Sequence, residues 1–252
     1  MYIFEYNELI RNLVISDLKT KYTGSLLGFA WSMVNPLLMM LVLYFVFSNI
    51  FNSNENFVLY LLTGIFAWRF FANGTTSAMG SIVGKSSLVT KIFIPREILT
   101  LSNTLSSFIS SILEFLVLIP LLIVLGAGIS VTILLVPFIH ILYFLIVYGT
   151  SLILASLYVY YRDLNQIWDV VLQVGFFLSP IVYPLSFIPE KYEFYYMLNP
   201  ITRLIIMYRD VLLEGIIPSI SDFGIVITFG LMLFFIGTLL FKKLSRRFAE
   251  EL

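Results

Sequence analysis

The sequence predicts an all-α integral membrane protein with six transmembrane helices. Hydrophobic residues make up 60% of the 252 positions, and charged residues make up 12%. Ordinary soluble domains carry about a quarter charged residues. The chain also contains several apolar runs of about 20 residues, the length that a helix needs to cross a bilayer. These runs are continuously apolar and do not alternate as the strands of a membrane barrel would, so helices are expected.

Composition also excludes several classes of protein. The formal net charge is zero, so the chain has no overall basic field for nucleic acid. It has no cysteine, which excludes disulfides, thiol nucleophiles and cysteine-based metal sites. The single histidine, His140, lacks a second histidine or paired carboxylates around it. We therefore expect no metal site and no catalytic residues in this chain.

The N-terminal segment, residues 2–22, is predicted to be an amphipathic helix on the membrane surface. Leu9, Leu13 and Leu18 are interspersed with charged residues there. A solvated leader is the alternative interpretation. A cleavable signal peptide is not expected, because the segment lacks a basic region followed by an apolar one.

The basic residues predict the orientation of the spans, which are expected at 27–50, 57–80, 99–125, 131–158, 167–187 and 222–241. Lys191, Arg203 and Arg209 fall on one side of the membrane. The other side receives eleven basic residues: Arg11, Lys19, Lys21, Lys85, Lys91, Arg96, Arg162, Lys242, Lys243, Arg246 and Arg247. Since cytoplasmic loops carry the excess of Lys and Arg, both termini are predicted to be cytoplasmic.

Two charged residues, Arg69 and Glu114, lie deep within the second and third predicted spans. An unpaired charge at this depth costs about 2.5–3.5 kcal/mol or more. Counting about 1.5 Å per residue from the outer ends of the two spans places both side chains at similar depth. They could pair with each other. Alternatively, each could face a water-filled pathway, or Arg69 could extend toward the membrane surface.

The predicted cytoplasmic loop at 81–98 mixes charged residues with the apolar Ile92, Phe93 and Ile94. Pro95 favours an extended conformation at Ile94. A plain connector would not need such exposed apolar residues, so we expect the loop to dock into a partner's groove. The segment GSIVGKS, from Gly80 to Ser86, is one residue too short for a phosphate-binding loop, so no ATP site is expected.

The predicted external segment, 180–221, contains five prolines and is rich in tyrosine. It is too apolar for a loop in water, and its prolines interrupt any continuous span. Interfacial or re-entrant helices meet both constraints.

Six motifs, in order along the whole chain, resemble those of type-2 ABC transporter permeases that export O-antigen, capsule or teichoic acid, the Wzm/TagG kind. A departure is Ser16, where such permeases often carry Arg. The motifs are DLKTKYTGSLLGFAWSMVNPL at 17–37, KIFIPREI at 91–98, YRDLNQI at 161–167, SPIVYP at 179–184, LNPITR at 198–203 and YRDVLLEG at 208–215.

This resemblance implies a permease subunit in the cytoplasmic (inner) membrane that exports a lipid-linked polysaccharide, with O-antigen as the first expectation. A second copy of the chain would complete the pathway. Two copies of a separate ABC ATPase would bind ATP and Mg, leaving this chain without a cofactor. The residues expected to couple to the ATPase are Asp17, Lys21, Lys91, Ile92, Phe93, Pro95, Arg96 and Glu97. Those expected in an external gate are Pro180, Pro184, Tyr195, Asn199, Pro200 and Arg203.

Aromatic residues, 17% of the chain, suit a sugar polymer because sugar C–H faces stack on aromatic rings. The candidates for lining the pathway are Trp31, Tyr44, Phe45, Phe47, Phe176, Phe177 and Tyr183. These rings could instead face lipid or form interfacial belts. Two other functions are considered: a type-2 ABC permease for drugs or small lipids, and a membrane glycan-modifying enzyme. The enzyme would need clustered acids or a poised histidine, whereas Asp163, Asp169 and His140 are scattered.

Overall fold

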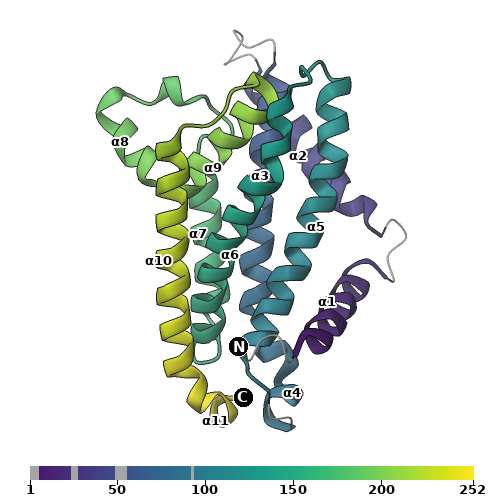
Figure 1. The fold of residues 1–252 in the computed structure, drawn as a ribbon, viewed down its shortest axis with the longest axis vertical. Coiled ribbons are helices and arrows are strands. Elements are labelled where there is room, and N and C mark those ends of the chain that lie inside the picture. Colours follow the sequence, from purple (N-terminus) through teal and green to yellow (C-terminus); the bar gives the residue numbers. More distant parts are fainter. Residues whose placement is uncertain (1–5, 24–27, 49–55, 92–93) are drawn as a thin grey trace.

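The computed structural model describes residues 6–23, 28–48, 56–91 and 94–252, and within these ranges every regular element is helical. Five helices are long and apolar enough to cross a membrane, which confirms the all-α membrane fold class. They stand side by side as a bundle in Figure 1. The five are α2 (Ala30–Phe47), α3 (Phe57–Met79), α5 (Glu97–Val124), α6 (Val136–Tyr158), which follows a 3-10 turn at Val131–Leu135, and α10 (Ile220–Leu244).

The predicted limits of the fifth span, 167–187, are wrong. The helix here, α7, runs from Leu164 to Leu178 and has 15 residues. At about 1.5 Å per residue it is roughly 22 Å long, shorter than a hydrocarbon core of about 30 Å. Ser179 is extended and Pro180 follows it, so the chain turns although its sequence stays apolar. The count of six full spans therefore stays a prediction.

Helix α3 is at the centre of the bundle and is buried along most of its length. Its side chains, among them Phe66, Trp68 and Phe70, form the middle of the main hydrophobic core. The helices packed around it are α2, α5, α6, α7 and α9. A largely apolar helix is expected in such a central position, and the polar residues of its second half, such as Arg69 and Asn73, are confined to one side.

Helices α6 and α10 pack closely because glycines face the neighbouring backbone. A Cβ atom on Gly149 would lie 2.6 Å from backbone atoms of Leu233 and Phe234, and one on Gly237 would lie 2.6 Å from the Gly149 carbonyl oxygen. Small residues let membrane helices approach in this way.

The short helices gather at the two ends of the bundle (Figure 1). One end carries α1 (Asn7–Tyr22), α4 (Ser86–Lys91) and α11 (Phe248–Glu251). The apolar face of α1, which includes Ile10 and Val14, packs on Ile98 at the start of α5. The opposite end carries α8 (Glu190–Leu198) and α9 (Pro200–Arg209), followed by a π turn at Asp210–Glu214.

Candidate functional site

An open polar cavity of about 860 Å³ lies between α1, α2, α3 and α5. Three cationic and two carboxylate side chains line it, which gives a formal charge of +1 (three minus two). The rest of the lining is mostly hydroxyl and amide groups. The lining residues are Ser16, Asp17, Thr20, Lys21, Tyr22, Gly28, Trp31, Ser32, Asn35, Arg69, Asn73, Thr76, Ser77, Lys85, Asn103, Ser106, Ser107 and Glu114.

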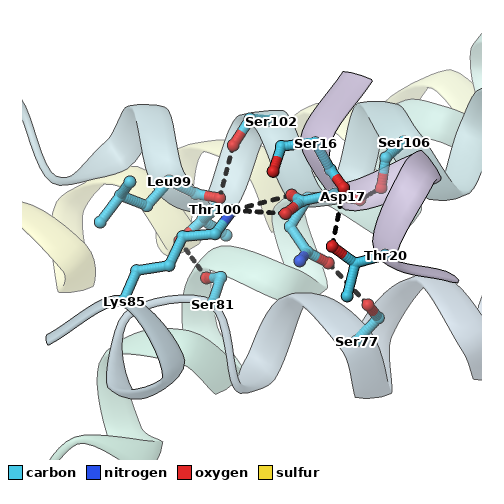
Figure 2. A network of polar contacts seen from close by, with 11 residues as sticks. Ser16, Asp17, Thr20, Ser77, Ser81, Lys85, Leu99, Thr100, Ser102 and Ser106 are labelled. Carbon is cyan, nitrogen blue, oxygen red and sulfur yellow. Dashed lines mark hydrogen bonds and ion pairs between the residues drawn. The ribbon is translucent and has the colours of Figure 1, made fainter. Parts of the chain in front are cut away.

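An ion pair joins α1 to the turn that follows α3, as Figure 2 shows. Lys85 Nζ lies 2.8 Å from both carboxylate oxygens of Asp17. Each side chain keeps less than a quarter of its exposure, 20% for Lys85 and 16% for Asp17, so the pair is only partly hydrated. This pair holds the C-terminal half of α1 over the cavity.

Polar contacts also hold α3 against α5 beside the cavity (Figure 2). Ser77 Oγ donates to Asn103 Oδ1 at 2.8 Å, and the hydroxyls of Ser81 and Thr100 lie 3.1 Å apart. The first half of α5 is rich in serine and threonine because hydroxyls can bond to their own helix in an apolar setting. Such bonds to carbonyls three or four residues earlier are made by Ser102, Thr104, Ser106 and Ser110.

Arg69 and Glu114 face each other in the wall of the cavity. Arg69 Nη2 lies 3.7 Å from Glu114 Oε1, and the Glu114 side chain is 4% exposed. The guanidinium also donates at 3.3 Å to Asn35 Oδ1 and to the carbonyl oxygen of Ser32 on α2. The two alternatives for these charges are therefore compatible, because they pair and also line an open polar cavity.

Among the residues expected to couple to an ATPase, Asp17 and Lys21 line the cavity. Lys91 is exposed at the end of α4, Pro95 is exposed, and Glu97 is the first residue of α5. The guanidinium carbon of Arg96 lies 5.9 Å from the centre of the Phe248 ring, next to α11. Ile92 and Phe93 lie outside the described residues, so the coupling role of this segment stays a prediction.

The aromatic residues expected to line a pathway do not gather in one place within a single chain. Trp31 lines the cavity, and Tyr44 and Phe45 are exposed along α2. Phe47 packs against the main core, Phe177 is exposed, and Tyr183 donates its hydroxyl to the Phe177 carbonyl at 2.7 Å. Phe176 is 6% exposed and packs edge-on against Trp68, so it is a core residue of this chain.

The residues expected in an external gate shape the turns of that region. Asn199 caps α9 by accepting from the Ile201 amide, and Pro200 is the first helical residue. Arg203 pairs with Asp222 at the start of α10. Pro184 precedes a short 3-10 turn, and Tyr195 is exposed. A second cavity, of about 840 Å³, is lined here by Tyr183, Phe187, Ile188, Pro189, Lys191, Tyr192, Tyr195 and Tyr196.

Arg209 is a buried residue that joins several backbone segments, whereas its sequence position predicts only an external basic residue. It is 5% exposed and donates to the carbonyl oxygens of Pro180, Ile181 and Tyr60 at 2.6, 3.2 and 3.1 Å. Its guanidinium also lies over the Tyr60 ring, 3.2 Å from the centroid. The turn after α7 has carbonyls without partners in a helix, and Arg209 and the Tyr60 hydroxyl supply donors to them. The prolines of SPIVYP indicate a turn there, but they do not indicate which residue would donate to its carbonyls.

Helix α7 carries a polar stripe that its apolar character as a predicted span did not indicate. Asn165, Gln166, Asp169 and Gln173 are all exposed in the single chain. Residues 165, 169 and 173 repeat every four positions and so share one face of the helix. Polar groups in a membrane helix face a partner or a water-filled space, because lipid offers them no hydrogen bonds. The four-residue spacing could have revealed this face.

The helical bundle and its cavity define an integral membrane protein with a polar chamber built beside its spanning helices. The chain belongs to the ABC-2 type transporter family, whose profile matches residues 8–213. It is 31% identical to the O-antigen export system permease protein RfbA of Klebsiella pneumoniae over 253 residues, which cover 100% of this chain and 96% of the relative. The permease of the same name from Myxococcus xanthus is 28% identical over 257 residues, 99% and 97% of the two chains. The polysialic acid transport protein KpsM of Escherichia coli is 21% identical over 258 residues, 92% of each chain.

Proposed function

We propose that this protein is the membrane-spanning permease subunit of an ABC transporter that exports a lipid-linked cell-surface polysaccharide, O-antigen first among the candidates, across the cytoplasmic membrane. The observation that carries the proposal is the match to an O-antigen export permease over nearly the full length of both chains. A shared short motif would support only the fold, whereas this match includes both ends of the bundle. Capsule polysaccharide is the next candidate, given the similarity to KpsM.

The proposed working unit contains two copies of this chain. The exposed polar stripe of α7 supports this arrangement, since a second copy or a shared aqueous path would keep Asp169 and Gln173 away from lipid. Helix α2 also exposes a large apolar surface, which includes Leu38, Val42 and Phe45. Both helices are available in the single chain for contact with a partner.

ATP and Mg are proposed to bind in two separate ATPase subunits at the end of the bundle that carries α1, α4 and α11. Residues 81–98 would dock on the ATPase, with α1 beside them. The Asp17–Lys85 ion pair supports a mechanical link, because it joins α1 directly to the start of this segment. The cation–π contact between Arg96 and Phe248 extends the link to the C-terminal helix.

Transport in inverted membrane vesicles tests the proposal. Vesicles containing this chain and its co-purified ATPase should accumulate radiolabelled lipid-linked O-antigen only when ATP is supplied. Vesicles with a Phe93→Asp permease should retain the folded chain but lose accumulation, because the charge disrupts apolar docking. Accumulation of hydrophobic drugs in place of the polymer would instead identify a drug permease. Covalent modification of the glycan without transport would identify an enzyme.

A further inference from the structure

An apolar cavity of about 400 Å³ lies between α5, α6 and the 3-10 turn that precedes α6. On α5 it is lined by Ile112 and Ile119, which face away from the side of the helix where Ser107 and Glu114 line the polar cavity. Its volume is within the usual range of small-molecule sites. The side chains that line it are apolar except for one, His140.

His140 is 3% exposed, and one of its two ring nitrogens has no partner in the described part of the chain. Nδ1 lies 2.7 Å from the Tyr208 hydroxyl oxygen, whereas Nε2 is buried without a hydrogen bond. The rings of Phe70, Phe108 and Phe115 surround the imidazole, with centroids 4.8, 5.0 and 5.2 Å from its own. Phenyl rings offer Nε2 no hydrogen-bonding oxygen or nitrogen, so a partner would have to enter from the cavity.

The bond to Tyr208 determines whether Nε2 is a donor or an acceptor. The Tyr208 hydroxyl has no other hydrogen-bond partner among the described residues. If it donates to Nδ1, the imidazole proton is on Nε2, and one buried group is unpaired. If Nδ1 donated instead, both the phenol proton and the Nε2 lone pair would be unpaired. The first arrangement leaves fewer buried polar groups without a partner, which assigns Nε2 as an N–H donor.

The depth of His140 restricts which molecules can bring an acceptor to it. Its position is four to five residues from the midpoint of the span Val131–Tyr158, or about 7 Å along the helix axis. If that midpoint is at the membrane centre, the edge of a hydrocarbon core of about 30 Å is about 15 Å from the centre. The ester carbonyls of bilayer lipids are held near that edge by their headgroups. An uncharged molecule dissolved in the core has no such tether and can reach His140.

We propose that this cavity binds an uncharged, membrane-soluble carbonyl compound, and that His140 donates to the carbonyl oxygen through Nε2. The cavity is open at its rim, where Leu116, Leu134 and Ile141 are exposed, so such a compound enters from the side of the bundle. Phe108 and Phe115 border both the imidazole and the cavity, which suits an aromatic ketone. The site is separate from the polar cavity and does not depend on the polymer that the protein exports.

Equilibrium binding to the full-length chain in phosphatidylcholine nanodiscs tests the inference, with partition into empty nanodiscs as the reference. The probes are benzophenone and diphenylmethane, which share two phenyl rings, but only benzophenone carries a carbonyl oxygen. Benzophenone should bind about fivefold tighter or more, the ratio that corresponds to one ordinary hydrogen bond. Ultraviolet light joins bound benzophenone to nearby C–H groups, and mass spectrometry should find the label within residues 108–119 and 133–141.

Three variants separate the hydrogen bond from the shape of the cavity. His140→Phe keeps an aromatic ring but has no donor, so the two probes should bind it with equal affinity. Ile112→Trp fills the cavity from α5 and should weaken the binding of both probes. Ile109→Trp is its matched control, because Ile109 is on the same helix and equally exposed, at 37%, but does not line the cavity. It should bind both probes like the wild type.

Equal affinity of the wild type for the two probes would overturn the inference and show that lipid tails or water fill the cavity. So would a preference for benzophenone that persists in His140→Phe, or photolabelling confined to residues outside the two ranges. If His140→Phe does not fold, the paired tryptophan variants still decide, since equal binding by Ile112→Trp and Ile109→Trp would place the probe elsewhere. The assay needs neither ATPase nor polymer, so its result is independent of the proposed export.

Discussion

At the scale of single residues, Arg69 and Glu114 neutralise each other only partly, because 3.7 Å separates their nearest charged atoms. The carboxylate is the more buried partner, with 4% of its side chain exposed against 18% for the arginine. Arg69 also has the Asn35 amide and the Ser32 carbonyl as acceptors. Removing Arg69 should therefore lower the free energy of unfolding more than removing Glu114.

A double-mutant cycle should show this asymmetry. Arg69→Gln leaves Glu114 buried beside a single cation, Lys21, and should lower the free energy of unfolding by about 2 kcal/mol or more. Glu114→Gln should cost less, because Arg69 keeps its other acceptors. The double variant should recover part of the loss. Thermal unfolding of the four purified proteins measures the cycle, and strictly additive losses would contradict an energetic pairing.

The position of a residue within a predicted span indicates its depth in the membrane, but it does not indicate which neighbouring helix the side chain faces. Counting along two consecutive spans places Arg69 and Glu114 at similar depth, and the structure brings them together. The burial of Arg209 could not be predicted in this way. Its partners are carbonyls of Tyr60 on α3 and of Pro180 and Ile181 in the turn after α7, which only the folded bundle brings to it. Backbone acceptors carry no side-chain signal in a sequence.

At the scale of whole elements, the packing of α6 on α10 depends on two glycines. The Cα of Gly149 faces the backbone of α10 so closely that an added methyl group would meet the Leu233 carbonyl carbon at 2.6 Å. A flexible side chain could move aside, whereas a helix backbone can yield only if the two helices separate. Such contact between backbones takes the place of a hydrophobic driving force, which is absent in lipid.

Gly149→Ala should therefore destabilise the bundle by about 1–3 kcal/mol, the usual cost of overpacking. Gly224→Ala is the matched control, since Gly224 lies in α10 and a Cβ atom there would meet no atom within 4 Å. The control should be neutral or more stable by about 0.5–1 kcal/mol, because alanine favours helix. Thermal unfolding followed by loss of the monodisperse chromatographic peak compares the two. Equal melting of Gly149→Ala and the wild type would show that the helices can separate freely.

Hydropathy predicts most helices to within a few residues but is wrong about the end of α7. The apolar character continues through SPIVYPLSF, so the predicted span extends to residue 187, whereas the helix ends at Leu178. Two prolines and the buried Arg209 decide where the chain turns, and hydropathy averages over such residues. The start of α5 and both ends of α10 were predictable because charged residues lie there.

At the scale of the whole molecule, the two ends of the bundle differ both in their short helices and in their number of basic residues. The end with α1, α4 and α11 carries Lys85, Lys91 and Arg96, whereas the end with α8 carries Lys191 and few other cations (Figure 1). The proposed second copy and the proposed ATPase are separate chains, so the sequence of one chain does not show where they would bind. Their contacts can therefore be inferred only from surfaces that one chain leaves exposed.

The orientation of these two ends in the membrane is testable, because the chain has no cysteine and a single introduced thiol gives no background. Lys91 is exposed at the end of α4, and Glu190 is exposed at the start of α8, so neither substitution removes packing. Since cytoplasmic loops hold the excess of Lys and Arg, Lys91→Cys should face the cytoplasm and Glu190→Cys the exterior. A membrane-impermeant maleimide should thus label Glu190→Cys in right-side-out vesicles and Lys91→Cys in inside-out vesicles. Labelling of Glu190→Cys only in inside-out vesicles would reverse the orientation and place the proposed ATPase-binding end outside the cytoplasm.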